Sequence, residues 1–284
     1  MLPYPSDPRI DESYVTSALR YVELAEEVNG PIPRPVDFAY VWGDALAELE
    51  RVAPDVRIIN LETAVTKSDD CGHNKGINYR MHPENIPCIT AAKIDCCVLA
   101  NNHVLDWGYE GLAETLATLK KVQTKAAGAG HSVEEAEAPS VLEVAAKEGS
   151  LFFPWVQKRA GYRRPGQRPQ RGPASISCRI YRGGLCGISR TGCGQSRKQG
   201  ILWWLPSIGV IIGATRFPEN RHGLLNQLID EAGVDVVHGH SSHRAKGIEV
   251  YVDPLLRLRG FSERLRGYRR LRTVSGRPGA AVLS

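Results

Sequence analysis

The sequence predicts an α/β fold with a largely parallel sheet. Residues 56–60 and 95–100 are rich in β-branched or other apolar side chains and predict short strands, and residues 109–122 carry apolar side chains at helical spacing. Strands that alternate with helices in this way indicate crossover connections, which join parallel strands. The chain of 284 residues is long enough for one large α/β domain or two small ones.

Two helices are predicted before the first strand. Asp11 is a suitable cap for a helix whose apolar residues follow helical spacing, namely Tyr14, Ala18, Tyr21, Val22 and Ala25. Three prolines between residues 31 and 35 interrupt the chain, and residues 42–52 predict a second helix. The first strand, at residues 56–60, then runs into Asn60-Leu61-Glu62.

The next segment repeats the order of helix, strand and helix. Residues 83–92 predict a helix, and residues 95–100 predict the second strand. In the helix at 109–122, the leucines at positions 112, 116 and 119 form an apolar face suited to packing on a sheet. Residues 126–130, Ala-Ala-Gly-Ala-Gly, predict a tight loop after it.

Regular patterning stops near Leu151 and returns near Pro218. Residues 151–199 are rich in Arg, Gly, Pro, Gln and Ser and show no sustained period, as in a linker, although the apolar groups at 203–204 and 210–212 are unusual for one. A helix ending near Gly233 and strands at 234–237 and 248–252 are predicted afterwards. We therefore expect one domain over residues 1–253, interrupted at 151–217, and a disordered Arg-rich tail at 254–284.

The net charge of +5 is an average of two different populations. Residues 151–216 contain 12 Lys or Arg and no acid, and residues 254–284 contain eight Arg and one acid. The rest of the chain is acidic, with 30 Asp or Glu against 16 Lys or Arg. Basic segments often bind nucleic acid, but a change of reading frame, described below, explains their composition without a ligand. We expect no nucleic-acid partner.

The expected location of the chain is the cytoplasm. Its first residues contain neither the basic nor the apolar region of a signal peptide, and no apolar run approaches the ~20 residues that span a bilayer. Seven cysteines without a regular spacing favour reduced thiols over a disulfide framework.

Polar clusters follow three predicted strands. These are Asn60-x-Glu62, Asn101-Asn102-His103 with Asp106, and His238-x-His240-x-x-His243. A single histidine after a strand is often an ordinary buried polar residue, and a histidine-rich loop can simply be solvated. Carboxylate, amide and imidazole groups gathered at the carboxyl ends of strands instead favour a divalent or dinuclear metal site.

The order of these motifs resembles the capsule synthesis and poly-gamma-glutamate biosynthesis (CapA) family, which is related to the calcineurin-like metallophosphoesterases. The resemblance runs through Ile59-Asn60-Leu61-Glu62-Thr63, Leu99-Ala100-Asn101-Asn102-His103 with Asp106 and Gly108, and the 127–130 loop. It resumes at 228–230, at the histidine cluster 236–243 and at 247–251, so that it covers roughly residues 5–148 and 218–253.

This resemblance implies a metallophosphoesterase-like α/β/β/α sandwich and a site with divalent metal ions, two in intact relatives. Glu62, Asn102, His240 and His243 would be metal ligands, and His238 is an additional candidate. Asn102 and His103 would be the catalytic Asn-His pair. The substrate-binding candidates are Asn60, Asn101 and Asp106. The implied substrate is an anionic polymer or a phosphorylated compound.

Two elements of the family pattern are missing, namely a first strand with a Gly-Asp motif and a His-Trp-Gly motif before the last helix. The chain is therefore expected to be truncated at its N-terminus. Codons for residues 200–218 can be chosen so that another frame reads DIVVATIHWGDNWGYEIP, and those for 256–267 can likewise read YGCGDFLNDYEG. We therefore expect that residues from about 150 to 217, and from about 254 onward, are frameshifted and non-native.

The sequence leaves two functions open. The first is a metal-dependent phosphoesterase-type hydrolase of capsule or poly-gamma-glutamate biosynthesis, in which metal-bound hydroxide attacks and His103 acts near the leaving group. Its activity would be impaired in this chain because ligands are missing. The alternative is a non-catalytic binding or assembly component of polymer synthesis or export with the same fold.

Overall fold

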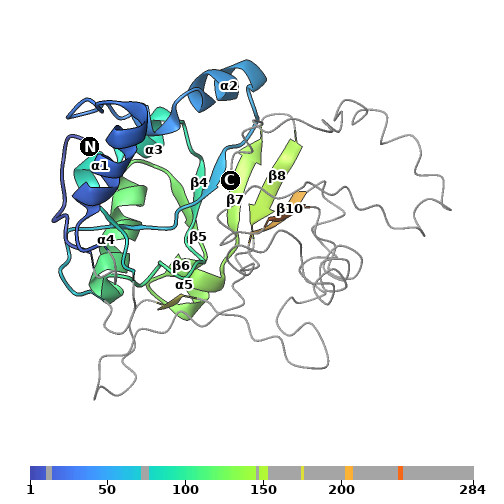
Figure 1. The fold of residues 1–284 in the computed structure, drawn as a ribbon. Coiled ribbons are helices and arrows are strands. Elements are labelled where there is room, and N and C mark those ends of the chain that lie inside the picture. The colour runs from blue at the N-terminus through green and yellow to red at the C-terminus, as the bar shows by residue number, and fades with distance from the viewer. Residues whose placement is uncertain are drawn as a thin grey trace, which may run out of the picture.

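The computed structural model describes residues 1–10, 15–71, 77–144, 147–152, 174–175, 202–206 and 236–238. These residues form an α/β fold, as predicted. Figure 1 shows helices α1, α3 and α4 on one side of strands β4 and β5, and strands β7 and β8 on the other side. The expected tail at 254–284 and the strand at 248–252 lie outside the described residues.

Helix α1 begins later than predicted, and the second predicted helix is divided into two. Helix α1 spans Ala18–Asn29, and the side chain of Ser17 caps it by accepting a hydrogen bond from the Leu19 N–H at 3.3 Å. The segment at 42–52 divides into a 3-10 helix, η1 (Tyr40–Trp42), and helix α2 (Ala45–Val52). Gly43 separates them with a φ of 50°, a left-handed conformation that favours glycine.

Three parallel strands form the sheet that carries the predicted site. They are β1 (Ile58–Asn60), β4 (Cys96–Val98) and β5 (Lys125–Ala127), in the order β1-β4-β5. Asn60 lies opposite Val98, and Val98 lies opposite Ala127. The strands therefore end level with one another, so the residues that follow β1 and β4 emerge at one edge of the sheet.

The central strand β4 is buried on both faces. Cys97 and Leu99 belong to the main core, whereas Cys96 packs with Ala127 and Leu142 on the opposite face. Burial of both faces is typical of a strand in the middle of a parallel sheet, and it explains the continuous apolar run at 96–100. The main core also takes side chains from α3 (Pro87–Ala91) and α4 (Gly108–Lys121).

Shorter elements surround this sheet. The segment at 83–92 forms η2 (Pro83–Asn85) followed by α3. The predicted loop at 126–130 instead contains the end of β5 and the short strand β6. The remaining elements of this part are β2 (Ala64–Val65), which pairs in parallel with β3 (Arg80–Met81), and β6 (Ala129–Gly130), α5 (Val133–Glu137) and β9 (Ala174–Ser175).

A second sheet has the strand order β11-β10-β8-β7. Strands β7 (Ser140–Val144) and β8 (Lys147–Phe152) are antiparallel, while β10 (Leu202–Pro206) pairs in parallel with both β8 and β11 (Val236–His238). Strand β7 lies beside β5, and the Lys125 Nζ donates a hydrogen bond to the Val141 carbonyl. The antiparallel pair was not predicted from the sequence.

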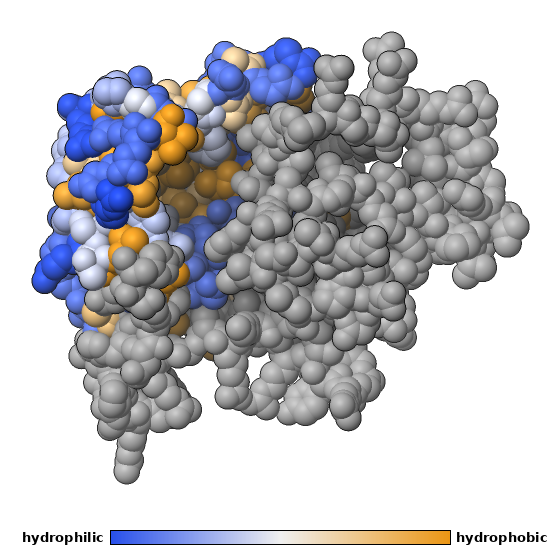
Figure 2. Space-filling view, in the orientation of Figure 1, coloured by the Kyte–Doolittle hydropathy of each residue, from blue (hydrophilic) through white to orange (hydrophobic). Residues whose placement is uncertain are grey.

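The visible surface of the described part is mostly hydrophilic, with apolar patches between polar side chains (Figure 2). Helix α1 contributes to the apolar exposure, since none of its residues is buried and Val28 is 82% exposed. Among the described residues, no helix combines the length and the apolar character needed to cross a membrane.

The buried thiols of β4 predict a loss of stability at alkaline pH. Burial raises the pKa of the Cys96 thiol from 9.0 to about 11, and burial also raises the pKa of Cys97. The unfolded chain therefore loses these protons first, so stability is full below pH 9 and falls as the pH rises toward 11. For Cys96 this loss is on the order of 3 kcal/mol.

Urea denaturation at pH 8 and pH 10.5 measures this loss. The substitution Cys96→Ala is expected to reduce the difference in unfolding free energy between the two pH values. Cys71→Ala, at a partly exposed thiol, is the matched control and should leave the difference unchanged. An equal pH dependence in wild type and Cys96→Ala would contradict the prediction.

Candidate active site at the ends of β1 and β4

The first strand-end cluster holds Glu62 beside Asn60. The Asn60 Nδ2 donates a hydrogen bond to the Glu62 Oε2 at 2.8 Å, and both residues are partly buried. Leu61, between them, donates its N–H to the Val98 carbonyl at 2.9 Å, which keeps this segment attached to β4. The chain therefore holds the carboxylate of Glu62 in place instead of leaving it on a loose loop.

Asn101 joins the two strand ends. Its Nδ2 donates to the Asn60 Oδ1 at 3.0 Å and to the Leu61 carbonyl at 2.9 Å, and its Oδ1 accepts from the His103 N–H at 3.0 Å. The side chain is fully buried. A buried amide with these partners is satisfied by the protein itself, so the structure places Asn101 as the link between the clusters.

The imidazole of His103 is paired with a buried carboxylate. Its Nδ1 lies 2.7 Å from the Asp106 Oδ2, and His103 and Asp106 are 8% and 0% exposed. The two residues are three positions apart in a turn that follows β4, and the Asp106 N–H donates to the His103 carbonyl. Since a carboxylate only accepts hydrogen bonds, Nδ1 carries the proton in this pair, and Nε2 forms the opposite edge of the ring.

The turn that carries this pair ends in a glycine for a steric reason. Gly108 has a φ of 64°, and a Cβ at this position would lie 2.5 Å from the Asp70 Oδ2. Any other residue would be strained in its backbone, and the Asp70 carboxylate would have to move aside. Helix α4 starts at Gly108, so the turn connects the buried pair directly to the helix that covers the sheet.

Tyr79, immediately before β3, contacts both His103 and Asp106. This contact was not predicted from the sequence. The Tyr79 N–H donates to the Asp106 Oδ2 at 2.6 Å, and the rings of Tyr79 and His103 are 4.3 Å apart between centroids. The Trp107 Nε1 donates to the Tyr79 carbonyl at 2.9 Å. No local pattern marks Tyr79, because these contacts join positions 24 to 28 residues apart and two of them use its backbone.

The other predicted ligands are not all brought into this cluster. Asn102 lies between Asn101 and His103 and is exposed. His238 is partly buried and ends β11 in the second sheet. His240 and His243 lie outside the described residues.

The donor chemistry fits part of a divalent metal site. Glu62 offers a carboxylate that Asn60 orients by a hydrogen bond, which is the usual support for a ligating carboxylate. Asn102 offers an amide oxygen from the neighbouring loop. Within the part of the chain that the structure describes, no three His, Cys, Asp or Glu side chains gather as a metal-binding group. Glu62 and Asn102 would therefore need further ligands, for which His240 and His243 are the sequence candidates.

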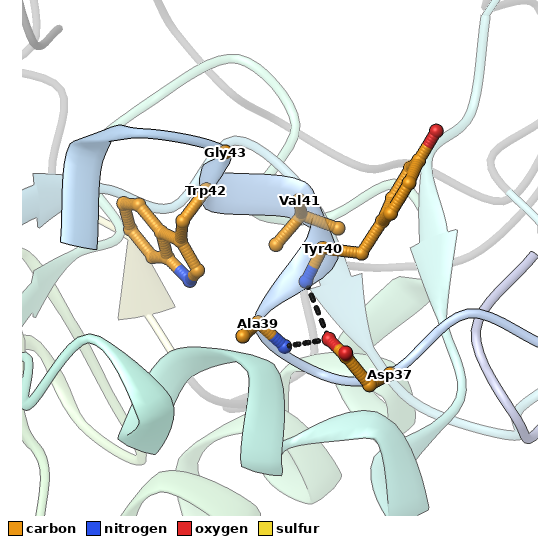
Figure 3. Close-up of a pocket in the computed structure, with 6 residues that line it drawn as sticks. All are labelled: Asp37, Ala39, Tyr40, Val41, Trp42 and Gly43. Atoms are coloured by element: carbon orange, nitrogen blue, oxygen red, sulfur yellow. Dashed lines mark hydrogen bonds between the residues drawn. The ribbon is translucent and has the colours of Figure 1, made fainter. Parts of the chain in front are cut away.

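A surface hollow elsewhere contains none of the predicted site residues. It is lined by Asp37, Ala39, Tyr40, Val41, Trp42 and Gly43. Figure 3 shows the Asp37 carboxylate turned toward its own loop, where its Oδ1 accepts from the N–H groups of Ala39 and Tyr40, each at 2.8 Å. The Trp42 Nε1 donates to the Cys88 carbonyl at 2.7 Å. These polar groups stabilise the loop and offer no convergent set for a ligand.

Comparison with known proteins supplies independent information on this chain. Residues 12–173 match the family model described as "Bacterial capsule synthesis protein PGA_cap". Two sequences from Mycobacterium tuberculosis strains, each named "Probable polyglutamine synthesis accessory protein", are 37% identical over 262 residues. The match covers 88% of this chain and 66% of each mycobacterial protein, slightly less than two thirds of their length.

A more distant similarity involves a protein of Sinorhizobium fredii. It is 35% identical over 108 residues, which cover 35% of this chain and 23% of the relative, and it is named only as uncharacterized. The family match spans Glu62, Asn102, His103 and Asp106, so the described site lies inside the matched region.

Proposed function

The chain belongs to the bacterial capsule synthesis (PGA_cap) family, and we propose that it serves capsule or poly-gamma-glutamate synthesis as a metal-dependent phosphoesterase-type hydrolase. Its substrate would be a phosphorylated compound or an anionic polymer. The observation that carries this proposal is the buried His103–Asp106 pair, joined through Asn101 and Asn60 to the carboxylate of Glu62.

The pair is suited to proton transfer. Asp106 holds Nδ1–H of His103 and so fixes the orientation and tautomer of the imidazole. Nε2, on the opposite edge, would give a proton to the leaving group from the imidazolium form of His103, in which both ring nitrogens carry protons and whose positive charge the Asp106 carboxylate stabilises. In this role Asp106 and Asn101, both buried, position His103 and the loop around it and do not touch the substrate.

Among the described residues, Glu62 and Asn102 would hold a divalent ion. His240 and His243 would be its other ligands, and His238 is an additional candidate. The ion, when bound, would supply Lewis-acid activation of water and of a phosphoryl oxygen. Asn60 would keep the Glu62 carboxylate oriented toward the ion. The finer architecture that we propose is the metallophosphoesterase-like sandwich, in which the ends of several strands contribute ligands.

Removing the carboxylate of Glu62 is expected to weaken metal binding by about 10-fold to 100-fold or more, the range seen when supporting groups of metal sites are lost. Metal content after equilibration with Mn²⁺ or Zn²⁺ would be measured for the purified chain and for Glu62→Ala, together with hydrolysis of bis(p-nitrophenyl) phosphate. Glu50→Ala, at an exposed carboxylate of α2, is the control and should retain wild-type metal content.

The alternative is a binding or assembly component without catalysis. It is favoured by the name "accessory protein" of the mycobacterial relatives and by the internal hydrogen bonds that occupy Asn101 and Asp106. Metal binding without hydrolysis would support this alternative, and a full-length relative that binds neither Mn²⁺ nor Zn²⁺ and is inactive would overturn the hydrolase proposal.

We further propose that residues from about 150 to 217 and from about 254 onward are read in a shifted frame, and that activity is reduced in this chain. The support is the family-like text in the alternative frames together with the acid-free composition of residues 151–216. The coding DNA tests this directly, since codons that cannot yield that text exclude it.

A further inference from the structure

The segment Ile77–Met81 contacts the His103–Asp106 pair from outside the strand ends. Tyr79 makes two different contacts with this pair. Its N–H donates to the same Asp106 oxygen that holds the His103 Nδ1, and its ring lies against the imidazole with 4.3 Å between centroids and 32° between planes. Two donors therefore converge on one carboxylate oxygen, and one of them belongs to the main chain.

Tyr79 is itself held from two sides. Its carbonyl accepts hydrogen bonds from the Ala64 N–H at 3.2 Å and from the Trp107 Nε1 at 2.9 Å. The next residue, Arg80, pairs with Ala64 in the β2–β3 ribbon, and its guanidinium lies 4.1 Å from the centre of the Trp107 ring. The backbone at Tyr79 is thus held by two hydrogen bonds to its carbonyl and by the pairing of the next residue in β3.

From this geometry we infer that Tyr79 is a positioning residue for His103. Its N–H sets the place of the Asp106 carboxylate, and its ring limits rotation of the imidazole, so that Nδ1 stays on Asp106. Tyr79 as a whole residue is 40% exposed, so it is not a core residue. This inference rests on the proposed function for its catalytic meaning, but the orientation of His103 is measurable without any reaction.

The imidazole N–H signals of ¹⁵N-labelled protein provide the test. The Nδ1–H signal of His103 is assigned by its loss in His103→Gln, and its exchange with water is compared among variants. Tyr79→Ala removes the ring and is expected to speed this exchange by at least about 10-fold, whereas Tyr79→Phe should preserve the wild-type rate. Trp107→Phe keeps a ring beneath Arg80 but removes the donor to the Tyr79 carbonyl. Its rate of Nδ1–H exchange should lie between those of wild type and Tyr79→Ala.

Tyr40→Ala is the matched control, since Tyr40 is an exposed tyrosine in η1. Circular dichroism verifies that each variant is folded at the temperature used. Should Tyr79→Ala prove unfolded, Trp107→Phe carries the test. An unchanged exchange rate in the folded variants overturns the inference.

Hydrolysis separates this inference from the proposed function. In a hydrolytic wild type, Tyr79→Ala is expected to lower kcat by about 10-fold to 100-fold, the loss typical of a misplaced catalytic group, with KM within two-fold. A full-length relative that binds no metal and is inactive refutes the proposed function, while the exchange measurement still decides the role of Tyr79.

Discussion

The substitution Asp106→Ala is expected to destabilise the fold by about 2–5 kcal/mol and to abolish any activity that depends on His103. Asp106 is fully buried and accepts from the Tyr79 N–H and the His103 Nδ1. Alanine leaves both donors without their acceptor, and an unsatisfied buried donor costs about 1–3 kcal/mol. Such a change is a large fraction of the ~5–15 kcal/mol that stabilises a typical domain.

Urea denaturation of wild type and variant measures the effect as a shift in midpoint at constant m-value. Asp106→Asn retains one oxygen and is expected to lose less stability than Asp106→Ala. Asp44→Ala is the matched control, because Asp44 is exposed and its side chain makes no capping bond to α2. An Asp106→Ala protein within 0.5 kcal/mol of wild type would show that the buried pair does not hold this turn together.

Leu112→Ala is expected to cost about 2–5 kcal/mol, the range for removing a buried leucine side chain from a packed core. Leu112 lies in α4, is 1% exposed and belongs to the main core beneath the site. Leu24→Ala, on α1, removes the same atoms from a residue that is 39% exposed, and should change the unfolding free energy by less than about 0.5 kcal/mol. Equal losses in the two variants would mean that α4 does not anchor the core.

The sequence predicts the sheet best where both faces of a strand are buried. The run at 96–100 is apolar throughout because Cys97 and Leu99 face one core and Cys96 faces another, and β4 lies inside the predicted range of 95–100. The leucines of residues 109–122 predict α4 for the same reason, since Leu112 and Leu119 are buried. Patterns that reflect packing are visible in the sequence.

The bounds of exposed helices, and breaks caused by a single backbone dihedral angle, are not predicted by the pattern of apolar residues. Asp11 and Ser17 are both good capping residues, and the predicted start at Asp11 is wrong because Ser17 caps α1. No buried face of α1 exists to favour one start over the other. Likewise, the positive φ of Gly43 divides the predicted helix at 42–52. The presence of a glycine in the sequence does not by itself predict a positive φ.

The candidate site likewise contains residues that the sequence predicts and residues that it does not. Asn60 and Asn101 follow predicted strands, and the level ends of β1 and β4 bring their side chains within 3.0 Å of each other. Tyr79 could not be found from the sequence, since its contact with Asp106 is made by a backbone N–H that every residue except proline possesses. The residues His240 and His243 stay a prediction.

The hydrogen bond between Asn101 and Asn60 joins the carboxylate of Glu62, which follows β1, and the imidazole of His103, which follows β4, into one network. Hydrogen bonds run from Glu62 to Asn60, from Asn60 to Asn101, and from Asn101 to the backbone N–H of His103. Substitutions within such a network do not have additive energies, because each removes support from the next member. We therefore expect the effect of a substitution at Glu62 to depend on which residue stands at position 103, and the reverse.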